Sequence, residues 1–208
     1  MARVRASRTL ENVARRYGYG HVAGVDEVGR GCLAGPVVAA AVVLRPERYV
    51  PRIADSKTVP AAERERLASA IRRAALCWHV AVVEPADIDR LNIHWASLEA
   101  MRLAVMALVP LPGFILVDGF AIPGLRMAQR PVTGGDRRCT AVAAASILAK
   151  VTRDRLMCDL HIRDPRYGFD RHKGYCTADH LEAVNRYGYS DAHRRSFKPA
   201  GLFDTMAD

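Results

Sequence analysis

The sequence predicts a mixed α/β domain with a small helical part at its C-terminal end. Short apolar runs of strand length alternate with longer segments whose apolar residues recur at helical spacing. The chain has 208 residues, 50% of them hydrophobic, which is enough to form the core of one domain. Its longest apolar run, residues 36–44, is far shorter than the roughly 20 residues that a membrane-spanning helix needs. We therefore expect no membrane partner.

Several short apolar segments of the chain are predicted to be strands. Residues 21–26 and 36–44 are apolar and are joined by a short glycine-rich turn, which favours an antiparallel pair. Further strands are predicted at residues 77–83, 113–119 and 127–132.

Helical spacing of apolar residues marks the segments between these strands. In residues 61–76 the apolar side chains of Leu67, Ile71 and Ala75 form a stripe that should be buried. Helices are predicted around residues 10–17, 61–76, 88–108, 139–163 and 177–187. Thr177 is expected to cap the last helix, and Gly188 to end it. The helix that starts near residue 139 opens with small residues, which permit close packing.

The C-terminal helices follow a loop, and this loop gives a soft boundary between two parts. We expect residues 1–163 to form the catalytic domain and residues 164–208 to form a helical part that contributes to substrate binding. The alternative is a single domain that includes both parts.

Charge and cysteine content limit the classes of function. Lys and Arg number 31 against 22 Asp and Glu, and the net charge of +9 favours a polyanionic partner, most often nucleic acid. The five cysteines include no Cys-x-x-Cys pair, so neither a zinc site nor a disulfide framework is predicted. This usage is typical of a reducing compartment, and we expect a cytoplasmic protein.

Four acidic residues stand apart from the solvated acids of the helices. Asp26 and Glu27 end one predicted strand, and Asp118 directly follows the apolar residues 114–117. Asp136 follows two glycines and precedes a long helix, where an ordinary helix-capping acid is the alternative interpretation. In α/β proteins, functional residues gather at the carboxyl ends of strands and at helix starts.

These acids predict a site for divalent cations. Carboxylates that are brought together repel one another, and a divalent ion relieves the repulsion. Ligand sets made of oxygen suit Mg²⁺ or Mn²⁺. Four carboxylates that hold two such ions can hydrolyse a phosphodiester, which agrees with the basic remainder of the chain. Asp26 and Glu27 should face the same site only if the chain bends there, and Gly29 and Gly31 can supply the bend.

Several motifs together resemble one family. The stretches "GVDEVGRG", "ADSK", "ILVDG", "GGD", "AAASILAKVTRD", "YGFDRHKGY" and "HRRSF" are similar, in order and spacing, to those of the ribonuclease HII family. The resemblance covers about residues 18–199. It implies a ribonuclease H-like fold, with a mixed central sheet flanked by helices.

The resemblance also implies an activity and a set of site residues. The expected activity is hydrolysis of the RNA strand of RNA–DNA hybrids, and cleavage at single ribonucleotides embedded in duplex DNA, leaving 3′-hydroxyl and 5′-phosphate ends. The four metal-binding acids of the family correspond to Asp26, Glu27, Asp118 and Asp136. The motif that reads the RNA–DNA junction corresponds to residues 29–31 (Gly29, Arg30 and Gly31).

The substrate tyrosine of the family corresponds to Tyr175, with Tyr167 as the rival. Candidate phosphate contacts are Lys57, Lys150, Lys173, Arg194 and Arg195; each alone is more simply a solvated charge, and Lys150 could instead pack against an acid. Some relatives carry a lysine and a glutamate where this chain has Gly134 and Ala141. We expect this departure to affect substrate positioning and not catalysis.

Two other functions remain open from the sequence. A nucleic-acid-binding module without catalysis would keep the basic surface but need not keep all four acids. A DNA-cutting nuclease of the same broad fold would cut an all-DNA duplex as readily as one that contains a ribonucleotide. We expect a monomer, and a docking role for the C-terminal "FDTMAD" in binding a repair protein stays undecided.

Overall fold

The computed structural model describes residues 6–50, 53 and 59–198. Within these residues the centre of the fold is a five-stranded sheet in the order β3-β2-β1-β4-β5. The strands are β1 (Val22–Val28), β2 (Val37–Leu44), β3 (Ala75–Val83), β4 (Phe114–Asp118) and β5 (Ala128–Val132). β1 pairs antiparallel with β2 and parallel with β4, so the sheet is mixed and the predicted antiparallel pair is confirmed.

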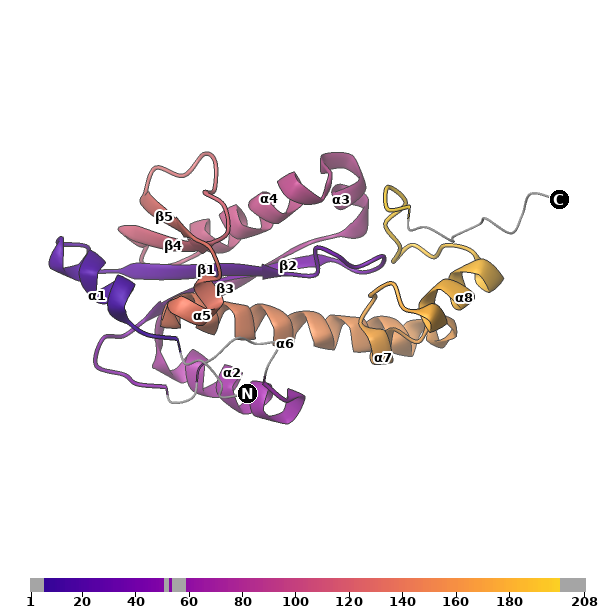
Figure 1. The fold of residues 1–208 in the computed structure, drawn as a ribbon, viewed down its shortest axis with the longest axis horizontal. Helices are drawn as coiled ribbons and strands as arrows, with labels where there is room; N and C mark the ends of the chain where they lie inside the picture. The colour runs from indigo at the N-terminus through magenta and orange to yellow at the C-terminus, as the bar shows by residue number, and fades with distance from the viewer. Residues whose placement is uncertain (1–5, 51–52, 54–58, 199–208) are drawn as a thin grey trace.

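Helices cover both faces of this sheet (Figure 1). One face carries α3 (Pro85–Leu91) and α4 (Ile93–Met106), and the other carries α2 (Ala61–Ala74) and α6 (Thr140–Arg163). The remaining elements are α1 (Thr9–Arg16), α5 (Gly135–Arg138), the 3₁₀ helix η1 (Pro165–Tyr167), α7 (Phe169–His172) and α8 (Ala178–Tyr187). The last three lie at the far end of α6 (Figure 1). No helix in the described part of the chain is long and apolar enough to cross a membrane.

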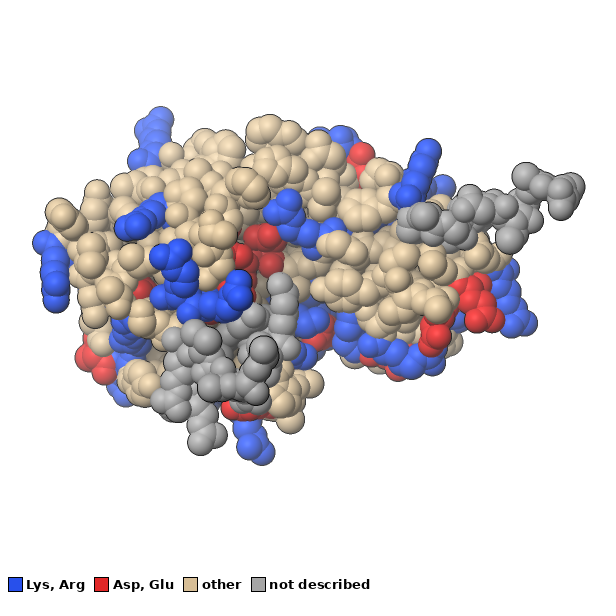
Figure 2. All heavy atoms as spheres, in the orientation of Figure 1, with Lys and Arg blue, Asp and Glu red and all other residues tan. Residues whose placement is uncertain are grey.

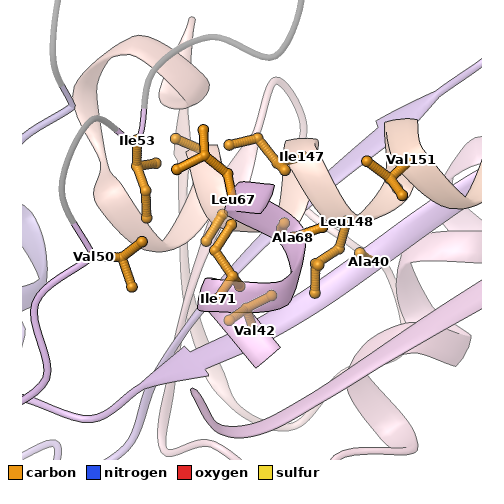
Figure 3. Packing of buried hydrophobic residues seen from close by; sticks show 14 of the residues in the cluster. Ala40, Val42, Val50, Ile53, Leu67, Ala68, Ile71, Ile147, Leu148 and Val151 are labelled. Carbon is orange, nitrogen blue, oxygen red and sulfur yellow. The ribbon is translucent and has the colours of Figure 1, made fainter. Parts of the chain in front are cut away.

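Strand β2 packs against both layers of helices. Every residue of its sequence VVAAAVVL is buried, as expected for a strand that is covered on both faces. Its alternate side chains divide between the layers: Ala40 and Val42 pack toward α2 and α6, whereas Ala39 and Ala41 pack toward α4. Figure 3 shows Ala40 and Val42 beneath the side chains of α2 and α6.

The predicted apolar stripe of α2 is buried, although its helix is shorter than expected. Leu67 and Ile71 pack against Ile147 and Leu148 of α6 in one cluster (Figure 3). The helix ends at Ala74, and Ala75 already belongs to β3. The strand therefore begins two residues earlier than the sequence predicts.

A glycine brings β1 unusually close to α6. A Cβ atom on Gly24 would lie 2.1 Å from the carbonyl carbon of Ala141, so only glycine fits this position. The run of alanines that opens α6 is the other half of this contact. Because of it, the start of α6 lies against the first half of β1, and α6 then runs along the strand, so that Arg153 reaches Gly29 beyond the end of β1.

The predicted single helix over residues 88–108 is wrong, because the structure has two helices there. Asn92 has φ of 66°, a left-handed conformation that ends α3. Its side-chain oxygen then accepts hydrogen bonds from the backbone N–H groups of His94 (3.0 Å) and Trp95 (3.2 Å), which caps α4. Asn92 thus both ends α3 and caps α4. The apolar periodicity continues across this residue, so it does not reveal the break between the two helices.

The C-terminal helix has the ends that the sequence predicts. The Thr177 hydroxyl accepts a hydrogen bond from the N–H of His180 (3.3 Å), and Gly188 ends α8 with φ of 74°. Side chains of this part pack with Leu33 and Met157 in one cluster. The proposed division at residue 163 thus crosses a shared core, and it stays a prediction.

Candidate active site

The four acids singled out in the sequence line a single cavity of about 470 Å³. β1 and β4 are adjacent and parallel, so their carboxyl ends, with Asp26, Glu27 and Asp118, meet at one edge of the sheet. Asp136 joins them from α5. Figure 2 shows acidic atoms gathered near the middle of one face, with Lys and Arg atoms around them. The other lining residues are Val28, Arg64, Ser146, Lys150, Asp154, Arg171, Lys173 and Tyr175.

Asp26 and Glu27 both line the cavity although the strand continues through them. β1 ends at Val28, and the bend comes at Gly29, which has φ of 94°. Asp26 is 5% exposed, and its Oδ1 accepts a hydrogen bond from the backbone N–H of Glu27 (2.8 Å). Glu27 lies at the open end of the strand, where its Oε1 is 3.4 Å from a guanidinium nitrogen of Arg30.

The carboxylates of Asp26 and Glu27 are crowded by other negative charges, and this affects their pKa values. Burial raises the pKa of Asp26 well above its usual value, and the charges of Glu27 and Asp118 raise it further. A hydrogen bond from Ser146 opposes this shift. The pKa of Glu27 is also raised, chiefly by burial; Arg30 opposes this effect and Asp118 adds to it. Ionised, these groups would be stabilised by a cation placed between them.

Two glycines bring the start of α5, which carries Asp136, against Asp118. The Oδ1 atom of Asp118 accepts a hydrogen bond from the N–H of Gly135 (2.7 Å). Gly134 has φ of 63° and occupies the N-cap of α5, so Asp136 stands inside the first turn and is not the capping residue. Asp136 is 8% exposed, and its Oδ1 lies 4.0 Å from Nε of Arg137.

The donor set of this cavity fits a hard divalent cation. Its four carboxylates offer oxygen ligands only, which are the ligands that Mg²⁺ and Mn²⁺ prefer. Among the described residues, no three Asp, Glu, His or Cys side chains are already arranged as a closed ligand set. The convergence of Asp26, Glu27, Asp118 and Asp136 in one cavity is the observation that favours a cation here, because a cation would offset the repulsion among the carboxylates, which together with burial raises the pKa of Asp26.

A fifth acid of the cavity, Asp154, was not singled out in the sequence. Its carboxylate contacts Nζ of Lys150 (2.7 Å) and a guanidinium nitrogen of Arg64 (3.3 Å). Lys150 therefore packs against an acid, as one interpretation of the sequence anticipated. The four-residue spacing of Lys150 and Asp154 on one helix is the signal that could have revealed the pair.

The loop after β1 is held from behind by a buried arginine. Arg194 is fully buried, and its guanidinium donates hydrogen bonds to the carbonyl oxygens of Gly29 (2.7 Å), Arg30 (3.0 Å) and Gly35 (2.9 Å). The structure thus corrects the expectation that Arg194 contacts phosphate, because none of its nitrogens faces the surface. Its role is to hold the backbone of the loop.

Gly29 and Gly31 have different surroundings. A Cβ atom on Gly29 would lie 2.3 Å from Nε of Arg153, a second fully buried arginine. Gly31 is exposed, and a Cβ atom there would meet nothing within 4 Å. Gly29 is therefore required by packing, whereas Gly31 leaves the surface of the loop open.

The two candidate tyrosines lie in different environments. Tyr175 lines the cavity and is 41% exposed. Tyr167 is 2% exposed, and its hydroxyl donates a hydrogen bond to the carbonyl of Gly188 (2.9 Å). Only Tyr175 is placed to touch a molecule bound in the cavity.

The remaining basic candidates are placed as follows. Lys173 lines the cavity, and its Nζ contacts the carbonyl of Asp170. Arg195 is exposed, and its backbone N–H donates to Asp89 (2.9 Å). Lys57 and the C-terminal "FDTMAD" lie outside the described residues.

Comparison with known proteins decides the family. The sequence profile described as "Ribonuclease HII" matches residues 23–200. The chain belongs to the ribonuclease HII family. The ribonuclease HII of Mycolicibacterium vanbaalenii is 51% identical over 192 residues, covering 91% of this chain and 77% of that protein. The ribonuclease HII of Nocardia farcinica is 50% identical over 193 residues, covering 92% and 77%.

Solved structures agree with the ribonuclease HII fold. The ribonuclease H2 of Pyrococcus horikoshii OT3 superposes with a TM-score of 0.71 at 26% identity, covering 86% of this chain and 94% of that one. The structure of the PCNA:RNase HII complex of Archaeoglobus fulgidus gives 0.72 at 27% identity, covering 86% and 96%. A Bst-RNase HIII in complex with Mn²⁺ is alike in fold, with a TM-score of 0.64 at 22% identity over 85% of this chain and 67% of that one.

Membership confirms the predicted fold and class of activity. As a ribonuclease HII, the chain is an endoribonuclease that acts on nucleic acid, and the family depends on a metal ion. A binding module without catalysis is therefore not the interpretation that these relatives support.

Proposed function

We propose that this chain hydrolyses the RNA strand of RNA–DNA hybrids and cuts at single ribonucleotides embedded in duplex DNA, leaving 3′-hydroxyl and 5′-phosphate ends. What supports the proposal is the single cavity that Asp26, Glu27, Asp118 and Asp136 share, in a chain whose net charge is +9. The acids supply the chemistry, and the basic surroundings attract the polyanion.

The four carboxylates would hold two divalent cations, Mg²⁺ or Mn²⁺, during catalysis. Bound there, the ions would make a water molecule acidic enough to act as a nucleophile near neutral pH, and would stabilise the charge on the leaving oxygen. The protein contributes the placement of its acids: β1 fixes Asp26 and Glu27, and the hydrogen bond from Gly135 orients Asp118. No protein side chain is needed as a nucleophile.

Recognition of the ribonucleotide is assigned to the loop of residues 29–31. A 2′-hydroxyl is the group that separates RNA from DNA, and backbone atoms can approach it where side chains are small. Gly31 leaves this approach open, while Arg194 holds the carbonyls of Gly29 and Arg30 from the other side. The Arg30 side chain, 37% exposed, is placed to contact a neighbouring phosphate.

Tyr175 is assigned to the sugar that follows the ribonucleotide. A flat ring packed on a deoxyribose leaves no room for another 2′-hydroxyl, which would select the RNA-to-DNA junction. The exposure of Tyr175 at the cavity supports this role, and the burial of Tyr167 does not support the rival.

The basic residues around the cavity would bind the phosphates of the duplex. Lys150 and Lys173 line the cavity, together with Arg64 and Arg171. Arg195 and Lys57 remain proposed contacts farther along the duplex. We further propose that the protein works as a monomer in the cytoplasm, and its five unpaired cysteines suit that reducing compartment.

Cleavage of three matched duplexes tests the proposed function. One duplex carries a single ribonucleotide, one carries an all-RNA strand on DNA, and one is entirely DNA. With Mg²⁺ or Mn²⁺ present, the first two are cut and the third is not, and the products carry 3′-hydroxyl and 5′-phosphate ends. Equal cutting of the all-DNA duplex would favour the DNA nuclease, and no cutting with either metal would favour a module that only binds.

A further inference from the structure

Three histidines of the C-terminal part, two of them buried, form a cluster beside Tyr175. His180 and His193 are 0% and 2% exposed. Their Nε2 atoms lie 3.1 Å apart, and the rings of His172 and His180 stack with centroids 4.4 Å apart. Such a group of buried imidazoles needs a consistent arrangement of protons, because each neutral ring has one donor and one acceptor.

The hydrogen-bond partners fix that arrangement. The backbone N–H of Ser190 donates to Nδ1 of His193 (3.0 Å), so this nitrogen is an acceptor and the ring proton sits on Nε2. Nε2 of His193 must then donate to Nε2 of His180. The proton of His180 consequently sits on Nδ1, which donates to the carbonyl oxygen of Tyr175 (2.9 Å).

The result is a directed chain from Ser190 through His193 and His180 to Tyr175. Every donor in it has an acceptor, and the order cannot be reversed, because it begins at a backbone N–H and ends at a carbonyl oxygen. An added proton on Nε2 of His180 would face the proton on Nε2 of His193. An added proton on Nδ1 of His193 would break the bond from the N–H of Ser190 and would have to turn to the Ser190 hydroxyl oxygen, 2.8 Å away. Burial correspondingly lowers the pKa of His180 to about 4 and that of His193 to about 4.

His172 belongs to the cluster but not to this chain. Its Nδ1 accepts from the N–H of Gly174 (3.2 Å), and its Nε2 faces the carbonyl oxygen of Tyr167 (2.7 Å). Its own bonds stay within the turn before Tyr175. His180 is thus the histidine whose ring bonds directly to the main chain of Tyr175.

The carbonyl of Tyr175 is a fixed point of the cavity wall. Besides the bond from His180, it accepts one from the N–H of Thr177 (2.9 Å), and the N–H of Tyr175 donates to the carbonyl of His172 (3.0 Å). Tyr175 also pairs with Cys32 in a β-bridge to the loop after β1. Loss of the bond from His180 would leave this carbonyl with the N–H of Thr177 as its donor and would hold the peptide that carries the exposed ring less firmly.

We propose that His180 and His193 are positioning residues, whose ordered hydrogen bonds hold Tyr175 in place for the sugar next to the scissile bond. The inference rests on the proposed role of Tyr175 in substrate binding. Neither histidine touches the substrate. Their effect on cleavage is transmitted through the backbone carbonyl of Tyr175.

Two substitutions at His180 separate hydrogen bonding from packing. Leucine fills a similar volume but cannot donate to Tyr175, whereas asparagine packs less well but places an amide donor near the position of Nδ1. We expect His180→Leu to lower kcat/KM about tenfold on a duplex with one ribonucleotide, and His180→Asn to keep most of the activity. His193→Leu and His193→Gln repeat the test at the second ring. The matched control is His79→Leu, at an exposed position of β3, which should leave kcat/KM unchanged.

A double-mutant cycle with Tyr175→Ala tests whether the effect passes through Tyr175. We expect Tyr175→Ala alone to lower kcat/KM, and His180→Leu to have no further effect in that background. The inference is overturned if leucine retains more activity than asparagine at position 180, or if His180→Leu costs the same tenfold without Tyr175.

The cycle also separates this inference from the proposed function. Unchanged activity of His180→Leu, with a clear loss in Tyr175→Ala, would contradict the positioning role and leave the role of Tyr175 intact. Unchanged activity of Tyr175→Ala would remove the tyrosine from substrate binding, and the inference with it, while the role of the four acids would stand.

Discussion

Two groups of charged residues in the interior of this protein differ in how the surrounding groups balance their charge. Arg153 and Arg194 are fully buried, and each donates three hydrogen bonds to backbone carbonyls. Asp26 is buried and Glu27 is partly buried beside a third carboxylate, and burial together with the charge of Asp118 raises the pKa of both.

This difference distinguishes residues that hold the fold together from residues that form the candidate site. A buried charge whose hydrogen bonds are all satisfied stabilises the backbone around it, as Arg194 does for the loop of residues 29–31. A buried charge among like charges is destabilising by itself, and such residues cluster where a ligand completes the arrangement. This comparison supports the proposed role of the acids in binding a ligand, whereas the arginines hold the backbone.

The largest expected effect follows from changing a site acid while keeping its hydrogen bond. In Asp118→Asn the amide oxygen can still accept from the N–H of Gly135. We expect turnover of a duplex with one ribonucleotide to fall about a thousandfold, or about 4 kcal/mol in activation free energy. Substrate binding, measured by fluorescence anisotropy, should fall much less. Full activity of this variant would remove Asp118 from the site.

The second largest expected effect is a loss of stability when one of the two buried arginines is replaced. Arg194→Leu leaves three backbone carbonyls without their donors, two of them on the buried residues Gly29 and Gly35, and we expect the free energy of unfolding to fall by about 3 kcal/mol or more. Arg155, which is 60% exposed and paired with Glu65, gives the matched control. Arg155→Leu should change the free energy by less than about 1 kcal/mol. Urea denaturation measures both, and equal losses would contradict the comparison.

Acid titration tests a third kind of buried group, the histidine chain. Below pH 6.5, the usual pKa of histidine, unfolded chains bind protons that folded His180 and His193, with pKa values of about 4, do not. The free energy of unfolding should therefore fall as pH drops from 6.5 toward 4, by about 2 kcal/mol per histidine at pH 5. Asp164, which raises the pKa of His193, and His172, which lowers both values, act on the same rings.

Because other groups titrate in this range, the measurement is a difference between two proteins. The difference in unfolding free energy between the wild type and His180→Asn should shrink as pH falls from 7 to 5. A difference that does not depend on pH would contradict the neutral, ordered chain.

The smallest expected effect tests whether Asp26 contributes to stability in the way that the buried arginines do. In metal-free buffer, Asp26→Asn should leave the free energy of unfolding unchanged or raise it by about 1 kcal/mol, because it removes a buried charge beside two others. The amide oxygen can still accept from the N–H of Glu27. A loss as large as that of Arg194→Leu would show that Asp26 supports the fold in the same way.

The sequence predicted the site acids better than the scaffold around them. Asp26, Glu27 and Asp118 follow apolar runs, and the carboxyl ends of neighbouring parallel strands meet at one edge. Nothing in the local sequence distinguishes Arg194 from the adjacent, exposed Arg195. Their difference depends on the loop that packs over them from more than 150 positions away.

The same limit applies to the elements of the fold. A continuous apolar run located β2, which is buried on both faces, and helical spacing of apolar residues located the buried stripe of α2. Such spacing missed the break at Asn92, since one residue in a left-handed conformation does not disturb the apolar pattern. The pairing of Asp154 with Lys150 was readable from spacing, but its place in the cavity depends on the fold.

Binding of Mn²⁺, followed by calorimetry at neutral pH, tests the central claim most directly. Two variants of one cavity are compared: Asp26→Asn removes an uncompensated carboxylate, and Asp154→Asn removes one that Lys150 and Arg64 already neutralise. We predict that the wild type binds Mn²⁺, that Asp26→Asn weakens binding at least about tenfold, and that Asp154→Asn binds like the wild type. Equal weakening in both variants, or no binding by the wild type, would contradict the account.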